Sequence, residues 1–141
     1  MNPFIYPCLW FDNQAKEAAE FYCSIFPNSK IIFESPMVVH CELNGHRFMG
    51  LNGGPQFKHT EATSFVIECK DQQEIDHYWN NLTADGGQES MCGWCKDKFG
   101  VSWQVVPAIL GDLMRDQEKA KRVFEVIMTM RKLDVQTILN A

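Results

Sequence analysis

The sequence of 141 residues contains no long hydrophobic run and no excess of positive charge. No apolar segment approaches the roughly 20 residues that a helix needs to cross a bilayer. Thirteen Lys and Arg residues stand against 18 Asp and Glu residues, which gives a formal net charge of −5. An acidic surface is a poor match for nucleic-acid phosphates or for an anionic membrane. We therefore expect neither nucleic acid nor a membrane as a partner.

The N-terminal residues MNPFIYPCLWF lack two features of a secretory signal peptide, a charged start and a small-residue cleavage site. Without such a leader, the six cysteines are expected to be reduced and partly buried thiols. These features predict a cytoplasmic protein without a disulfide framework.

Two segments of the chain resemble each other. Residues 9–26 and residues 65–82 each contain a short apolar run, an Asp and an amphipathic stretch that ends in aromatic residues. A second match relates residues 44–49 to residues 99–104. Such self-similarity is typical of a duplicated structural unit. The aligned pairs in the amphipathic stretches are Ala18 with Ile75, Phe21 with Tyr78, Tyr22 with Trp79, and Ile25 with Leu82.

Hydrophobic periodicity predicts the same order of elements in both copies, a strand, a helix and then three strands. Asp12 and Asp71 are expected to cap the two helices, and Asn44-Gly45 is a strong hairpin signal. The sequence thus predicts a single α+β domain of two βαβββ modules, about 1–53 and 62–107, followed by a C-terminal helix at about 110–131 and a short terminal helix or tail at 132–141. The expected strands are 4–11, 31–33, 37–43, 47–51, 64–69, 89–94 and 101–106, and the expected module helices are 12–26 and 71–82.

Three segments also carry a family resemblance: LWFDNQAKEAAEFYCSIFPNSKI, LNGGP at 51–55, and CGWCKDKFGVSWQVVP at 92–107. They resemble the PhnB-like branch of the vicinal oxygen chelate superfamily, which includes glyoxalase I, extradiol dioxygenases and bleomycin-resistance proteins. The resemblance implies two modules whose curved mixed sheets enclose a cavity, usually in a homodimer. Members often carry a demethylubiquinone methyltransferase description, but this chain has no glycine-rich loop between a strand and a helix for a methyl-donor nucleotide.

The resemblance further implies where metal-dependent relatives place their ligands, on the first and last strand of each module. The matching positions in this sequence are Tyr6, Met49, Ser64 and Gln104. This set offers one plausible ligand for a divalent ion, the amide of Gln104. We therefore expect neither the family metal nor another cofactor. The alternative is a metal-dependent lyase, isomerase or dioxygenase that uses a displaced set of ligands.

Strand parity predicts which other side chains would line the cavity, since alternate residues of a strand share a face. The lining face carries Tyr6, Cys8, Trp10, Arg47, Leu51, Val66, Glu68, Ser102 and Val106. The opposite face carries Leu9, Phe11, Phe48, Phe65, Ile67, Trp103 and Val105, which are expected to pack on the helices. The ligand-binding residues predicted from the matching positions, parity and aromatic character are Tyr6, Trp10, Arg47, Met49, Ser64, Glu68, Trp94 and Gln104.

Each of these assignments has a structural alternative. Tyr6 and Trp10 would also serve as packing residues that fill the cavity. Arg47 and Glu68 would be costly on an inward face unless they are paired or hydrated, so they either orient a ligand, bridge each other, or lie exposed at a sheet edge.

The leading functional hypothesis is a small-molecule-binding protein without the family metal, whose lining suits a planar or amphipathic organic ligand. A third hypothesis is a thiol redox protein that uses Cys92 and Cys95 of a C-x-x-C motif. A homodimer is expected because a helical stripe of Val123, Ile127 and Met130, or an open sheet edge, would otherwise be exposed.

Overall fold

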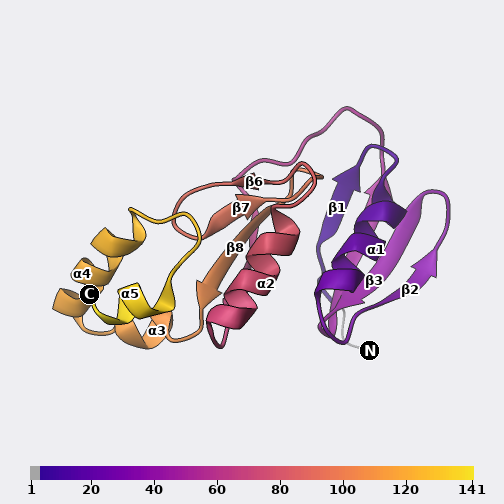
Figure 1. The fold of residues 1–141 in the computed structure, drawn as a ribbon. Helices are drawn as coiled ribbons and strands as arrows, with labels where there is room; N and C mark the ends of the chain where they lie inside the picture. The colour runs from indigo at the N-terminus through magenta and orange to yellow at the C-terminus, as the bar shows by residue number, and fades with distance from the viewer. Residues whose placement is uncertain (1–3) are drawn as a thin grey trace. The chain divides into compact units, whose positions relative to one another are not determined.

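Each half of the chain folds as a strand, a helix and three further strands. The computed structural model describes residues 4–141 and divides into two compact units, Met1–His59 and Thr60–Ala141. Each unit contains one four-stranded mixed sheet with one module helix on one of its faces (Figure 1). The predicted α+β class with two βαβββ modules is confirmed.

The first unit comprises β1 (Cys8–Phe11), α1 (Ala15–Ile25), β2 (Lys30–Glu34), β3 (Val38–Leu43) and β4 (His46–Asn52). The strand order is β1-β4-β3-β2, with β1 parallel to β4 and the other pairs antiparallel. Asn44 and Gly45 have φ values of 50° and 82°, as a tight hairpin between β3 and β4 requires. Helix α1 lies so close to β4 that a Cβ added at Gly50 would be 3.1 Å from the Cβ of Ala15.

The second unit repeats this order with β5 (Ser64–Cys69), α2 (Gln72–Leu82), β6 (Gln88–Glu89), β7 (Trp94–Lys96) and β8 (Ser102–Pro107). The strand order is β5-β8-β7-β6, with β5 parallel to β8. As predicted, Asp71 caps α2, because its side chain accepts a hydrogen bond from the Glu74 amide. Three of the four aligned helix pairs are buried in both units: Ala18, Tyr22 and Ile25 in α1, and Ile75, Trp79 and Leu82 in α2. In the fourth pair Tyr78 is buried, whereas Phe21 is half-exposed.

The cap of α1 differs from the prediction. Its N-cap is Gln14, which makes no side-chain capping bond. Instead, the Asn52 Oδ1 accepts a hydrogen bond of 2.9 Å from the Ala15 amide. The end of β4 thus supplies the cap that Asp12 was expected to provide.

Two strand predictions are also wrong in their bounds. Strand β1 begins at Cys8, four residues later than predicted. The predicted strand at 89–94 is interrupted, because Cys92 and Gly93 adopt left-handed φ values of 63° and 82°. The chain turns there, and strand pairing resumes at Trp94 as β7.

The C-terminal segment forms three helices, α3 (Leu110–Leu113), α4 (Gln117–Ile127) and α5 (Val135–Leu139). Two of them, α3 and α4, stand where one helix was predicted at 110–131, so that prediction is wrong, whereas α5 lies in the segment expected to be a short terminal helix or tail. The Asp116 side chain accepts hydrogen bonds from the Glu118 and Lys119 amides and thereby starts a new helix. Val123 and Ile127 of the predicted stripe are buried with Leu133 and Ile138. The stripe therefore belongs to the core of this unit and gives no reason to expect a partner.

The helical segment is tied to the second module by backbone hydrogen bonds. The Cys92 amide donates to the Met130 carbonyl at 2.7 Å, and the Gly93 amide donates to the Arg131 carbonyl at 2.9 Å. The Gln72 side chain bonds both the Leu133 carbonyl and the Val135 amide. The bonds of Cys92 and Gly93 hold the residues that precede β7, and those of Gln72 join α2 to the residues around the start of α5.

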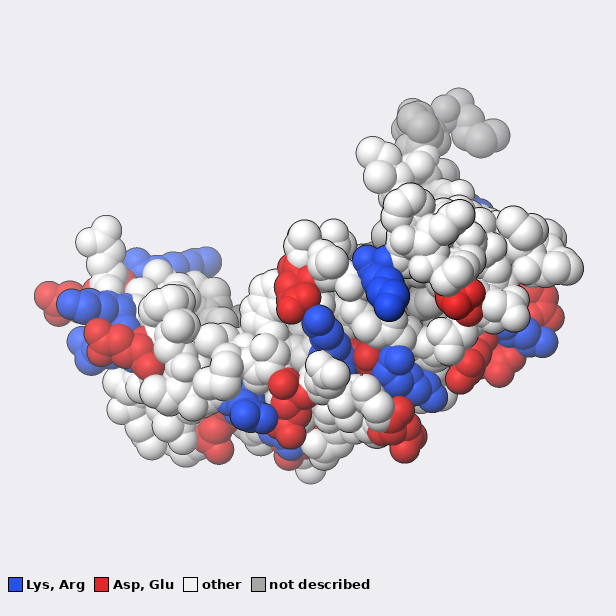
Figure 2. Space-filling model, turned by 90° about the horizontal axis from the view of Figure 1, so that it is seen from above, with Lys and Arg blue, Asp and Glu red and all other residues white. Residues whose placement is uncertain are grey.

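Charged side chains of both signs alternate on the face shown in Figure 2, with no patch of a single sign. Within residues 4–141, no helix has the length and apolar character that crossing a bilayer requires.

Candidate functional site

Each sheet has one face under its helix and one face turned away from it, which we call the open face. In β3, Val39, Cys41 and Leu43 are buried, whereas the alternating residues Val38, His40 and Glu42 are half-exposed. Of the seven residues that parity predicts on the helix-packed face, Leu9, Phe11, Trp103 and Val105 are buried as well. The other three, Phe48, Phe65 and Ile67, are half-exposed. The open faces therefore carry the side chains that remain available to a ligand.

On the open face of the first sheet, Arg47 is engaged by two aromatic neighbours. The Arg47 Cζ lies 4.5 Å from the centroid of the Tyr6 ring. The Arg47 Nη2 is 3.2 Å from the His40 Nδ1. A guanidinium only donates hydrogen bonds, so the Nδ1 accepts this one. Arg47 is exposed, so the expected cost of burying its charge does not arise.

His40 is the centre of this cluster and was not among the predicted site residues. Its ring centroid lies 6.0 Å from that of Tyr6 and 6.1 Å from that of Phe33. The alternation of β3 places His40 opposite Met49 of β4, which is half-buried. The cluster of Tyr6, Phe33, His40 and Arg47 is thus an aromatic and cationic surface that is held together by its own contacts.

Trp10 packs the segment that follows β4. Its indole Nε1 donates a hydrogen bond of 2.8 Å to the Gly54 carbonyl, and its ring meets Phe57 edge-on at 4.9 Å. A Cβ at Gly53 would lie 2.4 Å from the indole, so only glycine fits there. These are the contacts expected if Trp10 packs the structure rather than binds a ligand.

The open face of the second sheet is arranged in two rows across the strands. The first row runs from Ser64 through Ser102 and Lys96 to Gln88. The second row contains Val66, Gln104 and Trp94. Gln104 Nε2 donates a hydrogen bond of 2.9 Å to the Ser64 Oγ, so these two predicted site residues are in contact. Glu68 is exposed near the end of β5.

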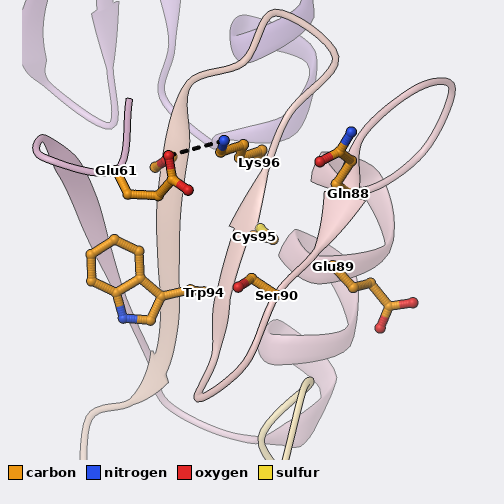
Figure 3. A pocket seen from close by; sticks show the side chains of 8 residues that line it. Glu61, Gln88, Glu89, Ser90, Trp94, Cys95 and Lys96 are labelled. Atoms are coloured by element: carbon orange, nitrogen blue, oxygen red, sulfur yellow. Dashed lines mark ion pairs between the residues drawn. The ribbon is translucent and has the colours of Figure 1, made fainter. Parts of the chain in front are cut away.

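A pocket of about 120 Å³ lies beside the first row (Figure 3). Its lining residues are Glu61, Gln88, Glu89, Ser90, Trp94, Cys95, Lys96 and Ser102. Of the predicted site residues, only Trp94 lines it.

One ion pair stands at this pocket. The Lys96 Nζ is 3.0 Å from the Glu61 Oε1, and the two side chains point toward each other in Figure 3. The hydrogen bond from Lys96 lowers the pKa of the Glu61 carboxyl below its ordinary value. The Glu89 carboxylate is engaged elsewhere, because it accepts a hydrogen bond from the Trp79 Nε1. The pocket therefore presents one cation with one carboxylate already on it.

Ser102 is the unusual member of the lining. It is 1% exposed, and its hydroxyl has no hydrogen-bond partner among residues 4–141. Leaving a buried hydroxyl unpaired costs on the order of 1–3 kcal/mol. A group that enters the pocket and bonds this hydroxyl would recover that free energy.

Lys96, Glu61 and Ser102 were not among the predicted ligand-binding residues. Parity predicts Ser102 on the lining face, but a strand at 89–94 would end before Lys96 and put it in the connector. With β7 at Trp94–Lys96, the same parity puts Trp94 and Lys96 beside Gln104 and Ser102. Glu61 comes from the turn before β5, which has no periodic pattern.

The positions that correspond to the family metal ligands do not suit a divalent cation. In the first module Cys8 pairs with Met49, and in the second module Val66 pairs with Gln104. Tyr6 comes two residues before Cys8 and Ser64 two residues before Val66, so Tyr6 and Ser64 occupy equivalent positions. A thioether, a phenol and a hydroxyl are weak ligands for such ions, and Gln104 already bonds Ser64. Within the described residues, no group of three or more His, Cys, Asp or Glu side chains could hold a metal ion.

The C-x-x-C motif does not have the setting of a redox site. Cys95 is 1% exposed in β7, and burial raises the pKa of its thiol to about 12. The Cys92 Sγ lies 3.5 Å from the Met128 Sδ. Reactive thiols of such motifs lie at helix N-termini, where the helix dipole lowers their pKa. Here the two cysteines belong to a turn and a strand.

Comparison with known proteins agrees with this architecture. Residues 3–106 match the family described as 3-demethylubiquinone-9 3-methyltransferase, so α3, α4 and α5 lie beyond the match. No curated protein sequence is significantly similar to the chain.

Among solved structures, a putative 3-demethylubiquinone-9 3-methyltransferase, PhnB protein, from Bacillus cereus is 30% identical, with a TM-score of 0.67, and the alignment covers 74% of this chain and 98% of that one. A protein from Pseudomonas aeruginosa is 20% identical with a TM-score of 0.61, covering 75% and 98% of the two chains. The fosfomycin resistance protein FosX from Listeria monocytogenes, complexed with Mn(II) and sulfate, shares the fold at 13% identity with a TM-score of 0.59, covering 88% and 98%. The chain thus belongs to the PhnB-like family described as 3-demethylubiquinone-9 3-methyltransferase, within the vicinal oxygen chelate superfamily.

Proposed function

We propose that this protein binds a small organic molecule on the open face of its second sheet and does so without the divalent metal of its superfamily. The observation that supports this most directly is the buried, unpartnered Ser102 hydroxyl at a pocket that also holds a lysine and a tryptophan. Natural binding sites combine an apolar surface with a few polar groups of this kind. Gln104, Ser64, Val66 and Glu68 extend the same face beyond the pocket.

The test is a fragment titration followed by amide NMR shifts, with anionic, neutral and cationic fragments of matched size. We expect perturbations that centre on residues 88–90, 94–96 and 102. Perturbations confined to other parts of the chain, with none at these residues for any fragment, would refute the proposal.

The absence of a functional metal is a separate part of the proposal and has its own test. The protein would be purified in the presence of Mn, Fe, Ni or Zn and its metal content measured. We expect less than stoichiometric metal, because the donors at Tyr6, Met49, Ser64 and Gln104 are poor. Stoichiometric metal that is lost in Gln104→Ala would instead favour the metal-dependent enzyme.

We also propose a homodimer in a reducing, cytoplasmic environment. Phe33 and Val66 leave more than half of their surface exposed on the open faces, which is an apolar liability in a monomer. All six cysteines are free thiols. Light scattering at micromolar concentration should give twice the mass of 16.2 kDa, and a monomer would contradict the assembly.

A further inference from the structure

We infer that the ligand of this pocket is a small planar organic carboxylate, that Lys96 and Ser102 bind its carboxylate group, and that Glu61 occupies this place when the ligand is absent. The inference rests on the proposed function, because it names the chemical class of ligand for the same pocket.

Lys96 and Ser102 both line the pocket, and both can donate a hydrogen bond to an acceptor atom of a ligand. Lys96 and Ser102 are cross-strand partners, so their Cβ atoms are about 5 Å apart on one face. An ammonium can only donate hydrogen bonds, and a hydroxyl beside it can donate one more. A carboxylate with two oxygens accepts from both at once. No other group at the pocket gives the Ser102 hydroxyl a partner within the described chain.

The Glu61 carboxylate already makes one of these two contacts, the one with Lys96. Its Oε1 lies 3.0 Å from the Lys96 Nζ, but its side chain is 64% exposed, against 32% for Lys96. Ion pairs with such an exposed partner contribute little to stability. A ligand carboxylate can therefore replace Glu61 on Lys96 at small cost, and it gains the Ser102 hydroxyl, which Glu61 does not bond.

The size of the pocket and Trp94 restrict the rest of the ligand. A volume of about 120 Å³ is small beside the roughly 300–1,000 Å³ of pockets that hold drug-sized ligands, so the ligand must be small. Trp94 lies two residues from Lys96 on the same face and is half-buried, so it offers an aromatic surface to a planar body. In Figure 3 its indole lies on the same side of the strands as Glu61 and Lys96. A carboxylate attached to a small ring fits this combination.

A cationic ligand that bound Glu61 and displaced Lys96 is the opposite possibility. The structure favours the anion, because the less exposed member of the pair is the lysine and its neighbour is the unpaired hydroxyl. The two possibilities predict opposite rankings of charged probes.

The experiment uses benzoate as the probe, with benzamide and benzylamine as neutral and cationic probes of the same shape. Affinities are measured by NMR titration of the Trp94 and Ser102 amides. We expect benzoate to bind at least about tenfold more tightly than benzamide, and Lys96→Met to weaken benzoate by at least about tenfold, as loss of a charge-assisted hydrogen bond implies. Glu61→Gln should strengthen benzoate by about two- to fivefold, because the removed competitor is a weak exposed ion pair.

The chain supplies a matched control in a second ion pair, Lys132 with Asp76, which has the same separation of 3.0 Å and the same lysine exposure of 32%. Lys132→Met and Asp76→Asn should leave benzoate affinity unchanged. If Lys96→Met does not fold, Glu61→Gln and Ser102→Ala decide the question, since we expect the first to strengthen and the second to weaken benzoate binding.

The outcomes separate the two levels of inference. Equal binding of benzoate and benzamide at the pocket, or preferred binding of benzylamine, would overturn the carboxylate assignment and leave the small-molecule site intact. A benzoate affinity that neither Lys96→Met nor Glu61→Gln changes would also overturn the carboxylate assignment. No response at the pocket to any of the three probes would overturn the proposed function itself.

Discussion

The open faces of the two sheets are built from equivalent strands, yet their polar groups are satisfied to different degrees. In the first sheet, Arg47 contacts Tyr6 and His40, and the Trp10 indole bonds Gly54. In the second sheet, Lys96 has only an exposed carboxylate as its ion-pair partner, and the Ser102 hydroxyl has no hydrogen-bond partner in the described chain. A ligand on the second face could therefore form hydrogen bonds with polar groups that the protein itself pairs weakly or not at all.

This difference arises although both modules follow the same plan. Equivalent positions of the two copies nevertheless make different contacts. Trp10 of the first copy packs against Gly53 and Phe57. The comparison predicts that equivalent substitutions affect stability in one sheet and binding in the other.

The largest difference is expected between the two tryptophans of the open faces. Trp10→Ala should lower the free energy of unfolding by about 3 kcal/mol, because it removes a packed ring and a hydrogen bond. Trp94→Ala should cost about 1 kcal/mol, because this ring lines a pocket, but it should weaken fragment binding there. Denaturant unfolding and NMR titration of both variants measure the two effects. Equal losses of stability would remove the distinction between the faces.

A smaller and more specific difference is expected between two serines that face each other across β5 and β8. Ser64→Ala should cost about 1 kcal/mol, because it leaves the Gln104 amide without its acceptor. Ser102→Ala should leave the ligand-free protein as stable as the wild type, or more stable by about 1 kcal/mol, because it removes an unpaired buried hydroxyl. If Ser102→Ala destabilises the protein as much as Ser64→Ala, its hydroxyl has a structural partner and the argument for the pocket fails.

The sequence predicted the fold well, because the fold depends on repeated apolar positions. Ala18 and Ile75, which the repeat aligned, are both fully buried under their sheets. Parity likewise placed Leu9, Trp103 and Val105 on the helix faces. Periodic burial is a local property of the sequence, so it can be read without knowledge of distant contacts.

The pocket was less predictable, because its residues meet through features that have no period. The left-handed Cys92 is held by a hydrogen bond to Met130, far along the chain, and this contact decides where β7 begins. Glu61 reaches Lys96 from a turn. The same reason explains the wrong cap at Asp12, since Asn52 reaches the start of α1 from the end of β4. The predicted roles in ligand binding all remain predictions, those of Tyr6, Trp10, Arg47, Met49, Ser64, Glu68, Trp94 and Gln104.

A modest effect is expected at Arg47, where the structure sharpens the choice between a buried bridge and an exposed cation. Arg47→Met should lower stability by no more than about 1 kcal/mol, because a cation over an aromatic ring at an exposed site contributes about 0.5–1 kcal/mol. A thermal or denaturant melt measures this. A loss of several kcal/mol would show that Arg47 is structural in a way that its contacts with Tyr6 and His40 do not explain.

The smallest expected effect is the pH response of Glu61, and it tests the ion pair directly. Hydrogen bonding from Lys96 lowers the pKa of Glu61 in the folded state, so the pair stabilises the protein above the ordinary carboxyl range and is lost as the pH falls through the lowered pKa. In Lys96→Met the Glu61 pKa should return toward its ordinary value of about 4.5. NMR titration of the Glu61 carboxyl carbon in both proteins measures the shift, with Asp76, whose pKa is also lowered, as the internal reference that Lys96→Met should not move.

A bound carboxylate should raise the Glu61 pKa in the wild type in the same way, because it takes Lys96 from Glu61. A Glu61 pKa that responds to Lys96→Met but not to saturating benzoate would mean that the ligand does not compete for the lysine, and the second sheet would then bind through Ser102 and Trp94 alone.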